Sequence, residues 1–274
     1  MTVNHDDLWS FEGKNVPIHW HNDLEINLIR EGEAVFQVYQ ECYRVRPGEG
    51  FLLNRNVPHS CSSAGNEQVR YSTILVRPDF LYGDFGSDVE RKCFQPFLQN
   101  SAIPCIHLTG FDENGKEILW KLNQVEEAFD RKRFCYELKI KGLLCEAFAM
   151  ILYGHRQELT KFVPANLQEL ERLEKMLNYL NMHFTEVISL QDLADQVHLS
   201  REVCCRLFKK MTGKTITGYL EEYRVNKSFS LVQSGQYSMT QITEMVGFSN
   251  PSRFASAFRK RFGCNPGEYN SVKH

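Results

Sequence analysis

The first third of the chain alternates short apolar runs with turns that contain glycine. Several short strands at such a spacing are typical of an all-β sandwich or barrel. The pattern therefore predicts a small β-sandwich or β-barrel between about residues 18 and 79, with strands at residues 25–29, 34–39, 50–53 and 71–77.

A helical period replaces the alternating one after about residue 116. Apolar side chains recur every three or four positions through residues 118–129, and again through residues 136–151 after a basic tripeptide at residues 131–133. This spacing predicts two amphipathic helices, and their short connection predicts an antiparallel pair. The apolar face of the pair has two possible uses, which are to cap the barrel or to contact a second copy of the chain.

The last hundred residues contain an internal repeat. Residues 189–200 align with residues 238–249, and residues 204–210 align with residues 254–260 after a one-residue insertion. Each copy predicts two helices joined by a short turn, the second helix being basic, which is the helix-turn-helix pattern. The second helix of such a unit fits the major groove of DNA.

Capping residues mark the helix starts in both copies. Ser189 and Ser238 each stand three positions before an Asp or a Gln, which is the capping-box spacing. The second helices are expected to begin after Ser200 in the first copy and after Asn250 in the second copy. These matched caps support two units in register.

Residues 217–232 lie between the two copies and read as one helix. Sixteen helical residues span about 24 Å. With the hairpins added at both ends, this rod would hold the two groove-entering helices about 34 Å apart, which is one turn of duplex DNA. Both helices could then lie in successive major grooves on one face of the DNA.

The composition is that of a globular protein, with 42% hydrophobic and 24% charged residues in 274. That length allows two domains. We find neither an apolar run of about 20 residues, as a membrane helix needs, nor a secretory signal. Without such a run, we expect no membrane partner. The nine cysteines form no CxxC pair, so we expect free thiols in the cytoplasm.

Charge is distributed unevenly along the chain. Residues 1–164 carry 18 Lys and Arg against 23 Asp and Glu, whereas residues 199–274 carry 12 against 5. A basic end on an otherwise acidic chain indicates a polyanionic partner for that end alone.

Residues 167–270 resemble the DNA-binding domain of the AraC/XylS family of bacterial transcriptional regulators. The resemblance is carried by the strings SLQDLADQVHLSREVCCRLFKKMTG, YLEEYR and ITEMVGFSNPSRFASAFRKRFGCNPGEY. It implies two helix-turn-helix units per subunit that bind double-stranded promoter DNA. It also implies a transcription factor that works with RNA polymerase, most often as an activator.

The resemblance also places base-reading side chains on the second helix of each unit. Arg206 could bond bidentately to guanine, and Glu202 could accept from cytosine. The second unit offers fewer hydrogen-bonding groups, so we expect the first unit to carry more of the specificity. The candidates are Arg201, Glu202, Cys205 and Arg206 in the first unit and Ser252, Arg253 and Ser256 in the second.

Five basic residues are candidates for phosphate contacts, which position a protein without reading sequence. They are Lys209, Lys210, Arg224, Arg259 and Lys260. The alternative for a basic helix end is a solvated position that the helix dipole favours. Arg224 could instead be structural and pair with Glu221, Glu222 or a backbone carbonyl.

The first half of the chain resembles a cupin barrel, which many AraC-type regulators carry as an effector-binding domain. The resemblance rests on His19, His21 and Glu25, on the string PGEG at residues 47–50, and on His59. Alternation along a strand puts His19 and His21 on one face. Three imidazoles and a carboxylate suit Zn, Mn, Fe or Ni.

Two interpretations of this His cluster compete. The residues either line a pocket for a small molecule such as a sugar or a related metabolite, or they hold a divalent transition metal, as the matching tetrad does in cupin enzymes. The fused DNA-binding half favours the pocket without a metal. We therefore count no cofactor as certain.

The sequence predicts an α+β chain with two domains. A cupin-like β-barrel with an antiparallel helix pair, residues 1–160, is expected to bind an effector and to form a homodimer. A linker at residues 160–167 leads to an all-α domain, residues 167–274, with two helix-turn-helix units joined by a linker helix. The predicted function is an effector-responsive transcription factor without enzymatic activity, and the alternative is a metal-dependent cupin enzyme with a DNA-binding tail.

Overall fold

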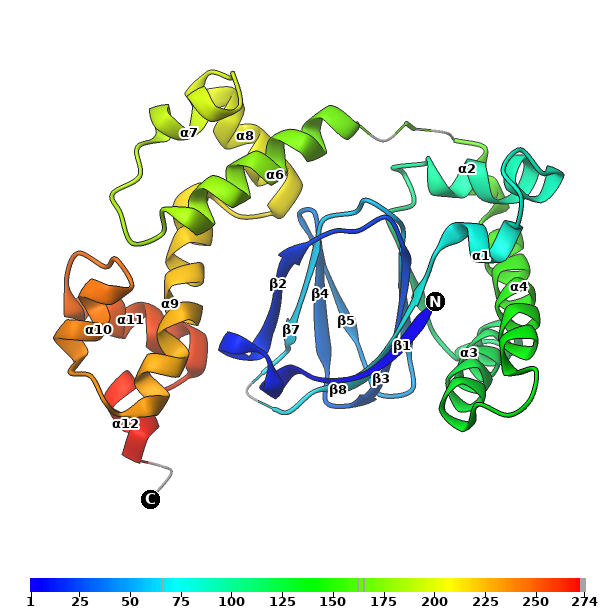
Figure 1. Cartoon of the computed structure of the whole chain (residues 1–274), viewed down its shortest axis with the longest axis horizontal. Helices are drawn as coiled ribbons and strands as arrows, with labels where there is room; N and C mark the ends of the chain where they lie inside the picture. The colour runs from blue at the N-terminus through cyan, green and yellow to red at the C-terminus, as the bar shows by residue number, and fades with distance from the viewer. Residues whose placement is uncertain (66, 162, 165, 272–274) are drawn as a thin grey trace. The chain divides into compact units, whose positions relative to one another are not determined.

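The computed structural model describes residues 1–65, 67–161, 163–164 and 166–271. Phe162 and Ala165 of the expected linker, and residues 272–274 of the expected second domain, lie outside the described residues. The chain divides into two compact units, and each is described by itself (Figure 1). Unit 1 comprises Met1–Leu8, Pro17–Val38 and Cys42–Asn166, and unit 2 comprises Trp9–Val16, Tyr39–Glu41 and Leu167–His274.

Unit 1 is built on two β-sheets. The five-stranded sheet has the order β1-β8-β3-β6-β9, and the four-stranded sheet has the order β2-β7-β4-β5. Neighbouring strands of the five-stranded sheet run antiparallel, and β4 pairs antiparallel with β7 in the other sheet. The strands are β1 Thr2–Asp7, β2 Asn15–His19, β3 Leu24–Glu31, β4 Ala34–Val38, β5 Glu41–Val45, β6 Gly50–Leu53, β7 His59–Ser63, β8 Arg70–Val76 and β9 Cys105–Leu108.

Apolar side chains fill the space between the two sheets. Phe36 on β4 and Phe51 on β6 come from different sheets, and their stacked rings lie 4.8 Å apart between centroids. Both side chains are almost completely buried. Two packed antiparallel sheets confirm the sandwich or barrel that the alternating pattern predicts and the cupin-like fold that the resemblance implies.

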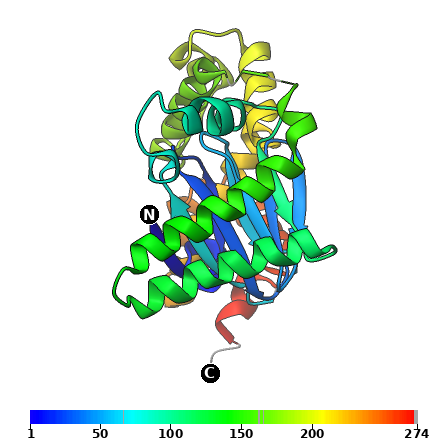
Figure 2. The ribbon, with the colours of Figure 1, turned by 90° about the vertical axis from the view of Figure 1, so that its right-hand side faces the viewer.

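Two long helices pack on the five-stranded sheet. They are α3 Glu113–Arg131 and α4 Tyr136–Gly154, and they cross one face of the strands side by side (Figure 2). Their buried side chains join those of β3, β6 and β8 in one hydrophobic core. The predicted helix pair is therefore present, and one face of it covers the barrel. The shorter helical segments of the first half are η1 Leu8–Ser10, η2 Glu12–Lys14, α1 Pro78–Tyr82, η3 Glu90–Phe94, α2 Gln95–Leu98 and α5 Arg156–Leu159.

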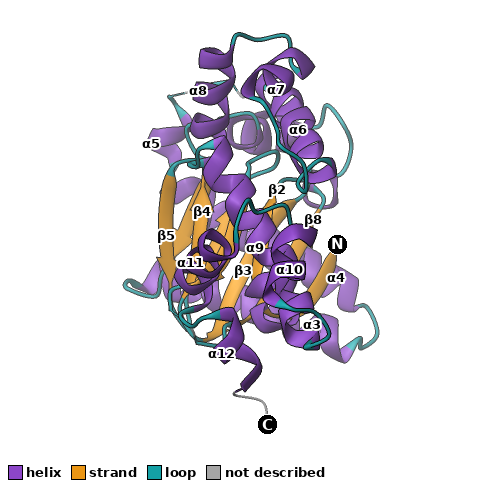
Figure 3. Cartoon of the chain, turned by 90° about the vertical axis from the view of Figure 1, so that its left-hand side faces the viewer, coloured by secondary structure: helices purple, strands orange, loops and turns teal. Residues whose placement is uncertain are grey.

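Residues 167–271 are helical, with no strand among them (Figure 3). No helix in the described residues is long and apolar enough to cross a membrane. Each of the nine cysteines, all of which are described, has a free thiol. The helices are α6 Leu167–Met182, α7 Leu190–Gln196, α8 Arg201–Thr212, α9 Ile216–Ser234, α10 Met239–Met245, α11 Pro251–Phe262 and α12 Pro266–Ser271.

The expected caps form at the helix starts of unit 2. The hydroxyl of Ser200 accepts from Val203 N, and the amide oxygen of Asn250 accepts from Arg253 N. Of the two expected capping boxes, the one at Ser238 has both reciprocal bonds. At Ser189 the hydroxyl accepts from the backbone of the third residue on, but the shorter Asp side chain there makes no return bond.

The turn of each helix-turn-helix unit contains a residue in the left-handed region. Gly247 has φ +77° in the second unit, and His198 has φ +53° at the aligned position of the first unit. A Cβ on Gly247 would lie 2.7 Å from the backbone of Thr185, closer than real contacts allow. The same bend is therefore made twice, and in the second unit it requires glycine.

Candidate functional site

Helix α8 separates a buried face from a charged, exposed face. Cys204, Leu207, Phe208 and Met211 are buried. The opposite face consists of five exposed residues, which are Arg201, Glu202, Arg206, Lys209 and Lys210. Cys205 is half-buried beside them. The first helix-turn-helix unit thus turns almost all of its proposed DNA-contacting residues toward solvent.

Glu202 lies in the first turn of α8, where backbone amides are not used by the helix. Its own backbone amide and the Ser200 hydroxyl hydrogen bond to the carboxylate and lower the pKa of Glu202. The carboxylate is therefore ionised at neutral pH and available as a hydrogen-bond acceptor. This is the state that acceptance from a cytosine amino group requires.

Helix α11 has the same two-faced construction with less hydrogen-bonding capacity. Phe254, Phe258 and Phe262 are buried in the core of the second helix-turn-helix unit. The exposed face carries Ser252, Arg253, Ser256, Arg259 and Lys260. Two of these five side chains are serines, so this helix presents fewer long polar groups than α8 does.

Three of the proposed DNA-contacting cations are already paired within unit 2. Lys210 Nζ lies 2.7 Å from a Glu169 carboxylate oxygen, and Arg253 Nη2 lies 3.0 Å from Glu221 Oε2. Arg224 donates from Nε to the carbonyl of residue 184 at 2.6 Å and from Nη2 to the carbonyl of residue 186 at 2.7 Å. These contacts favour the structural interpretation of Arg224.

Arg206, Lys209 and Lys260 differ from those paired cations. Within the described residues their side chains are exposed and make no hydrogen bond or ion pair. A cation without an internal partner loses no contact when it moves to a phosphate or a base edge. The sequence could not make this distinction, because the partners come from α6, from α9 and from the residues between α6 and α7.

Helix α9 is longer than predicted and joins the two helix-turn-helix units. It has 19 residues, which at 1.5 Å per residue is a rod of about 28 Å. Figure 1 shows α7 and α8 near one end of α9 and α10 to α12 near the other. The spacing of about 34 Å between the groove-entering helices stays a prediction.

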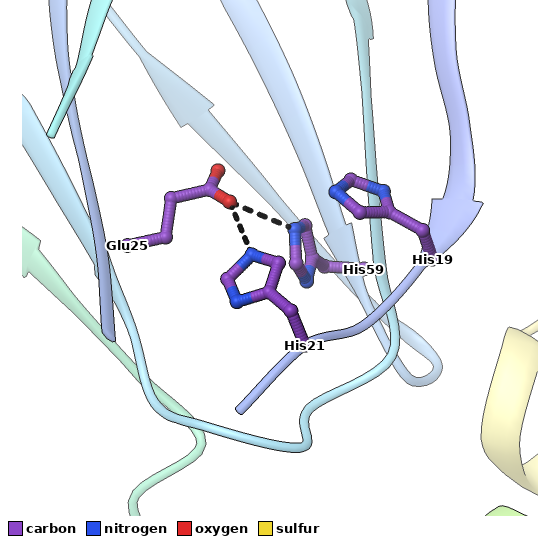
Figure 4. Close-up of side chains that lie close together, drawn as sticks. All are labelled: His19, His21, Glu25 and His59. Carbon is purple, nitrogen blue, oxygen red and sulfur yellow. Dashed lines mark hydrogen bonds and ion pairs between the residues drawn. The ribbon is translucent and has the colours of Figure 1, made fainter. Parts of the chain in front are cut away.

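Unit 1 brings together all four residues of the predicted His cluster. Glu25 lies on β3 and His59 begins β7 (Figure 4). The expected alternation of His19 and His21 along one strand is wrong, because β2 ends at His19 and His21 lies in the segment that follows. One potential ligand atom from each residue lies within 4.8 Å of the other three. His21 Nε2 is 2.7 Å from Glu25 Oε2, and His59 Nε2 is 3.4 Å from the same oxygen.

Burial and mutual contact shift the protonation of this cluster. Burial, with His59 nearby, lowers the pKa of His19 to about 4, so that ring is neutral at pH 7. Burial would lower the pKa of His21, but its hydrogen bond to Glu25 outweighs this and raises the pKa. Burial would raise the pKa of Glu25, but contacts with His21 and His59 hold the pKa well below its usual range.

Asn27 is a residue of the cluster that the sequence reasoning missed. It is fully buried, and its amide donates to Glu25 Oε1 at 2.7 Å. The signal was present in the sequence, because residues two apart on a strand share a face. Asn27 fixes one carboxylate oxygen and leaves Oε2 directed at the imidazoles.

Comparison with known proteins identifies both halves of the chain. The family described as "AraC-like ligand binding domain" matches residues 8–104, and the family described as "Helix-turn-helix domain" matches residues 193–271. Each match lies in the half where the corresponding resemblance was seen.

Relatives match nearly the whole chain. The HTH-type transcriptional activator RhaR of Mannheimia succiniciproducens is 31% identical over 268 residues, which cover 93% of this chain and 87% of the relative. An uncharacterized HTH-type transcriptional regulator of Bacillus subtilis, YdeC, is 28% identical over 258 residues, which cover 94% and 87%. The structure of ToxT from Vibrio cholerae aligns at 15% identity and a TM-score of 0.48, covering 99% of both chains. The chain therefore belongs to the AraC family of transcriptional regulators, with a ligand-binding domain followed by a helix-turn-helix DNA-binding domain.

Proposed function

We propose that this regulator is an effector-responsive activator that reads promoter DNA mainly through α8. The observation that carries the proposal is the exposed face of α8. There the Arg206 side chain makes no hydrogen bond or ion pair among the described residues, and local hydrogen bonds lower the pKa of Glu202. Arginine reads guanine bidentately, and a carboxylate accepts from cytosine. In the proposal α11 contributes recognition of the shape of the DNA and contacts with its phosphates. Ser252 and Ser256 are the hydrogen-bonding groups of this helix.

Lys209, Lys210, Arg259 and Lys260 would contact phosphates on either side of the bases read by α8 and α11. Such contacts release counterions, so affinity falls steeply as salt rises. Duplexes selected from a random pool supply the probe, and fluorescence anisotropy over a salt series supplies the affinities. Binding that neither selects a sequence nor depends on salt would refute the proposal.

We further propose that the regulator is a homodimer that uses the α3–α4 pair. One face of the pair covers the barrel, yet large apolar side chains of the pair and of its connection remain exposed. Trp120 is 57% exposed, Leu138 is 72% exposed, Phe134 is 99% exposed and Tyr153 is 70% exposed. Exposed apolar side chains in such number are typical of an interaction surface. Dimerisation would double the number of groove contacts with one promoter.

We propose activation as the direction of regulation. The relative from Mannheimia is a transcriptional activator by name, which supports activation and a contact with RNA polymerase for this chain as well. We place the protein in the bacterial cytoplasm with the promoter DNA on which it acts. A promoter fused to a reporter, transcribed in the presence and absence of the protein, tests the sign.

The barrel of unit 1 would bind the effector. A sugar-like effector stays a prediction from the family resemblance, and effector addition should change the affinity for the selected duplex. The relatives are transcriptional regulators, which argues against catalysis. The His cluster motivates the alternative of a metal-dependent enzyme with a DNA-binding tail, and substrate turnover abolished by His21→Ala would favour that alternative.

A further inference from the structure

The His cluster has a feature that an ordinary polar pocket does not need. Each of its three imidazoles hydrogen bonds through Nδ1 to a backbone carbonyl two residues away. His19 contacts the Pro17 carbonyl at 3.0 Å, His21 contacts that of residue 23 at 3.0 Å, and His59 contacts that of residue 57 at 2.8 Å. A carbonyl oxygen only accepts, so every Nδ1 must carry the proton.

This arrangement fixes the tautomer of all three rings. When each ring is neutral, its Nε2 bears a lone pair, and the Nε2 atoms of His21 and His59 approach Glu25 Oε2 (Figure 4). The rings of His19 and His59 lie 4.2 Å apart between centroids, and those of His21 and His59 lie 5.5 Å apart. Three lone pairs and a carboxylate oxygen then face one another in a small volume.

The carboxylate is oriented in the same way. Asn27 holds Glu25 Oε1 at 2.7 Å, and the Thr73 hydroxyl contacts Asn27 Oδ1 at 3.1 Å. Glu25, Asn27 and Thr73 are all buried. Outer contacts of this kind, to the second nitrogen of each imidazole and to the carboxylate, orient metal ligands in proteins.

One buried nitrogen in the cluster makes no hydrogen bond. His59 is 2% exposed, and within the described residues its Nε2 has no hydrogen-bond partner, although Glu25 Oε2 lies 3.4 Å away. Buried polar atoms almost always have partners, so such an atom requires an explanation. A cation bound to this lone pair would supply one.

We propose that His19, His21, Glu25 and His59 bind one divalent first-row transition-metal ion in the barrel of unit 1. For bonds of about 2.1 Å, adjacent ligand atoms lie roughly 3.0 Å apart in octahedral geometry and about 3.4 Å apart in tetrahedral geometry. The 2.7 and 3.4 Å separations from Glu25 Oε2 are close to these values. Imidazole nitrogens select such metals over Mg²⁺ and Ca²⁺, which prefer oxygen. The inference does not depend on the proposed DNA readout.

The test uses the full-length protein after removal of metal with a chelator. Co²⁺ is added in steps, and its visible absorption and the metal retained after gel filtration are recorded. We expect saturation at one equivalent, and unchanged binding in the presence of millimolar Mg²⁺. His19→Ala and Glu25→Gln should each weaken Co²⁺ binding at least about 10-fold, while circular dichroism shows the fold retained.

A second cluster provides the matched control. His5, Glu126 and Asp130 also bring potential ligand atoms within 4.8 Å of one another, but His5 and Asp130 are exposed. His5→Ala should leave Co²⁺ binding unchanged. Loss of binding in His5→Ala, or unchanged binding in both His19→Ala and Glu25→Gln, would overturn the proposal.

X-ray absorption of the cobalt-loaded protein gives a readout that needs no variant. Three imidazole ligands should produce the outer-shell scattering of histidine rings around the ion. A shell of oxygen ligands without imidazole scattering, or the failure of the wild-type chain to bind one equivalent, would also refute the site. None of these measurements uses DNA. A negative result would therefore refute the metal site without bearing on the proposal of promoter binding.

Discussion

Arg206→Ala should weaken binding to the preferred duplex by about 5- to 150-fold without destabilising the protein. Arg206 is exposed, and in the part of the chain that the structure describes its side chain makes no hydrogen bond or ion pair, so its truncation removes none from the fold. The free energy of unfolding should therefore change by less than about 0.5 kcal/mol. A bidentate contact with guanine contributes about 1–3 kcal/mol of discrimination, and this free energy sets the expected loss.

The loss should be confined to one base position. Fluorescence anisotropy with the selected duplex and with single-base variants of that duplex measures the loss. Arg206→Ala should bind the selected duplex and the variants changed at that one position with equal affinity. Arg206→Lys is the matched control, because it keeps the charge but lacks the bidentate fork. It should recover affinity for all duplexes without recovering the base preference.

Lys209→Ala gives the opposite pattern on the same helix. A phosphate contact should be lost equally from every duplex, and the slope of log affinity against log salt should fall by about 0.9. Over a fourfold change in salt, that slope corresponds to about a 3-fold difference in affinity. Identical patterns for Arg206→Ala and Lys209→Ala would refute the assignment of Arg206 to base reading.

Three further changes test other parts of the account. Gly247→Ala should destabilise unit 2 by about 2 kcal/mol in chemical denaturation, because its positive φ and the nearby Thr185 backbone exclude a Cβ; an unchanged midpoint would contradict the turn geometry. Arg224→Met should cost about 1–2 kcal/mol of stability through two lost hydrogen bonds. A reduced salt slope with unchanged stability would instead make Arg224 a phosphate ligand. Leu138→Glu should convert the proposed dimer to a monomer in analytical ultracentrifugation, and a dimer that persists would place the interface elsewhere.

The elements of the fold could be predicted because their signals are local. Helix starts at Ser200 and Asn250 follow from side chains that cap the backbone amides three positions on. The repeat identified both helix-turn-helix units, since the apolar spacing and caps recur in register. His198 is the exception within the repeat, because a non-glycine residue at positive φ is not evident from residue type.

The candidate sites could be predicted only in part. The four residues of the His cluster do come together, as the cupin-like spacing predicts. The expected strand alternation does not account for His21, because β2 ends at His19. The carbonyl partners of the His21 and His59 Nδ1 atoms lie outside the strands, in segments whose conformation the sequence pattern does not specify. The ion pairs of Lys210 and Arg253 likewise come from helices distant in sequence, so side-chain type alone could not separate paired cations from unpaired ones.

Hydroxyl-radical footprinting and methylation interference on the selected promoter duplex test the central claim most directly. Two helix-turn-helix units on the rod formed by α9 should give two major-groove contacts on one face of the DNA, about 10 base pairs apart. Arg206→Ala should remove interference at a guanine in one contact and leave the other intact. A single contact, or two contacts on opposite faces of the duplex, would contradict tandem reading of successive grooves.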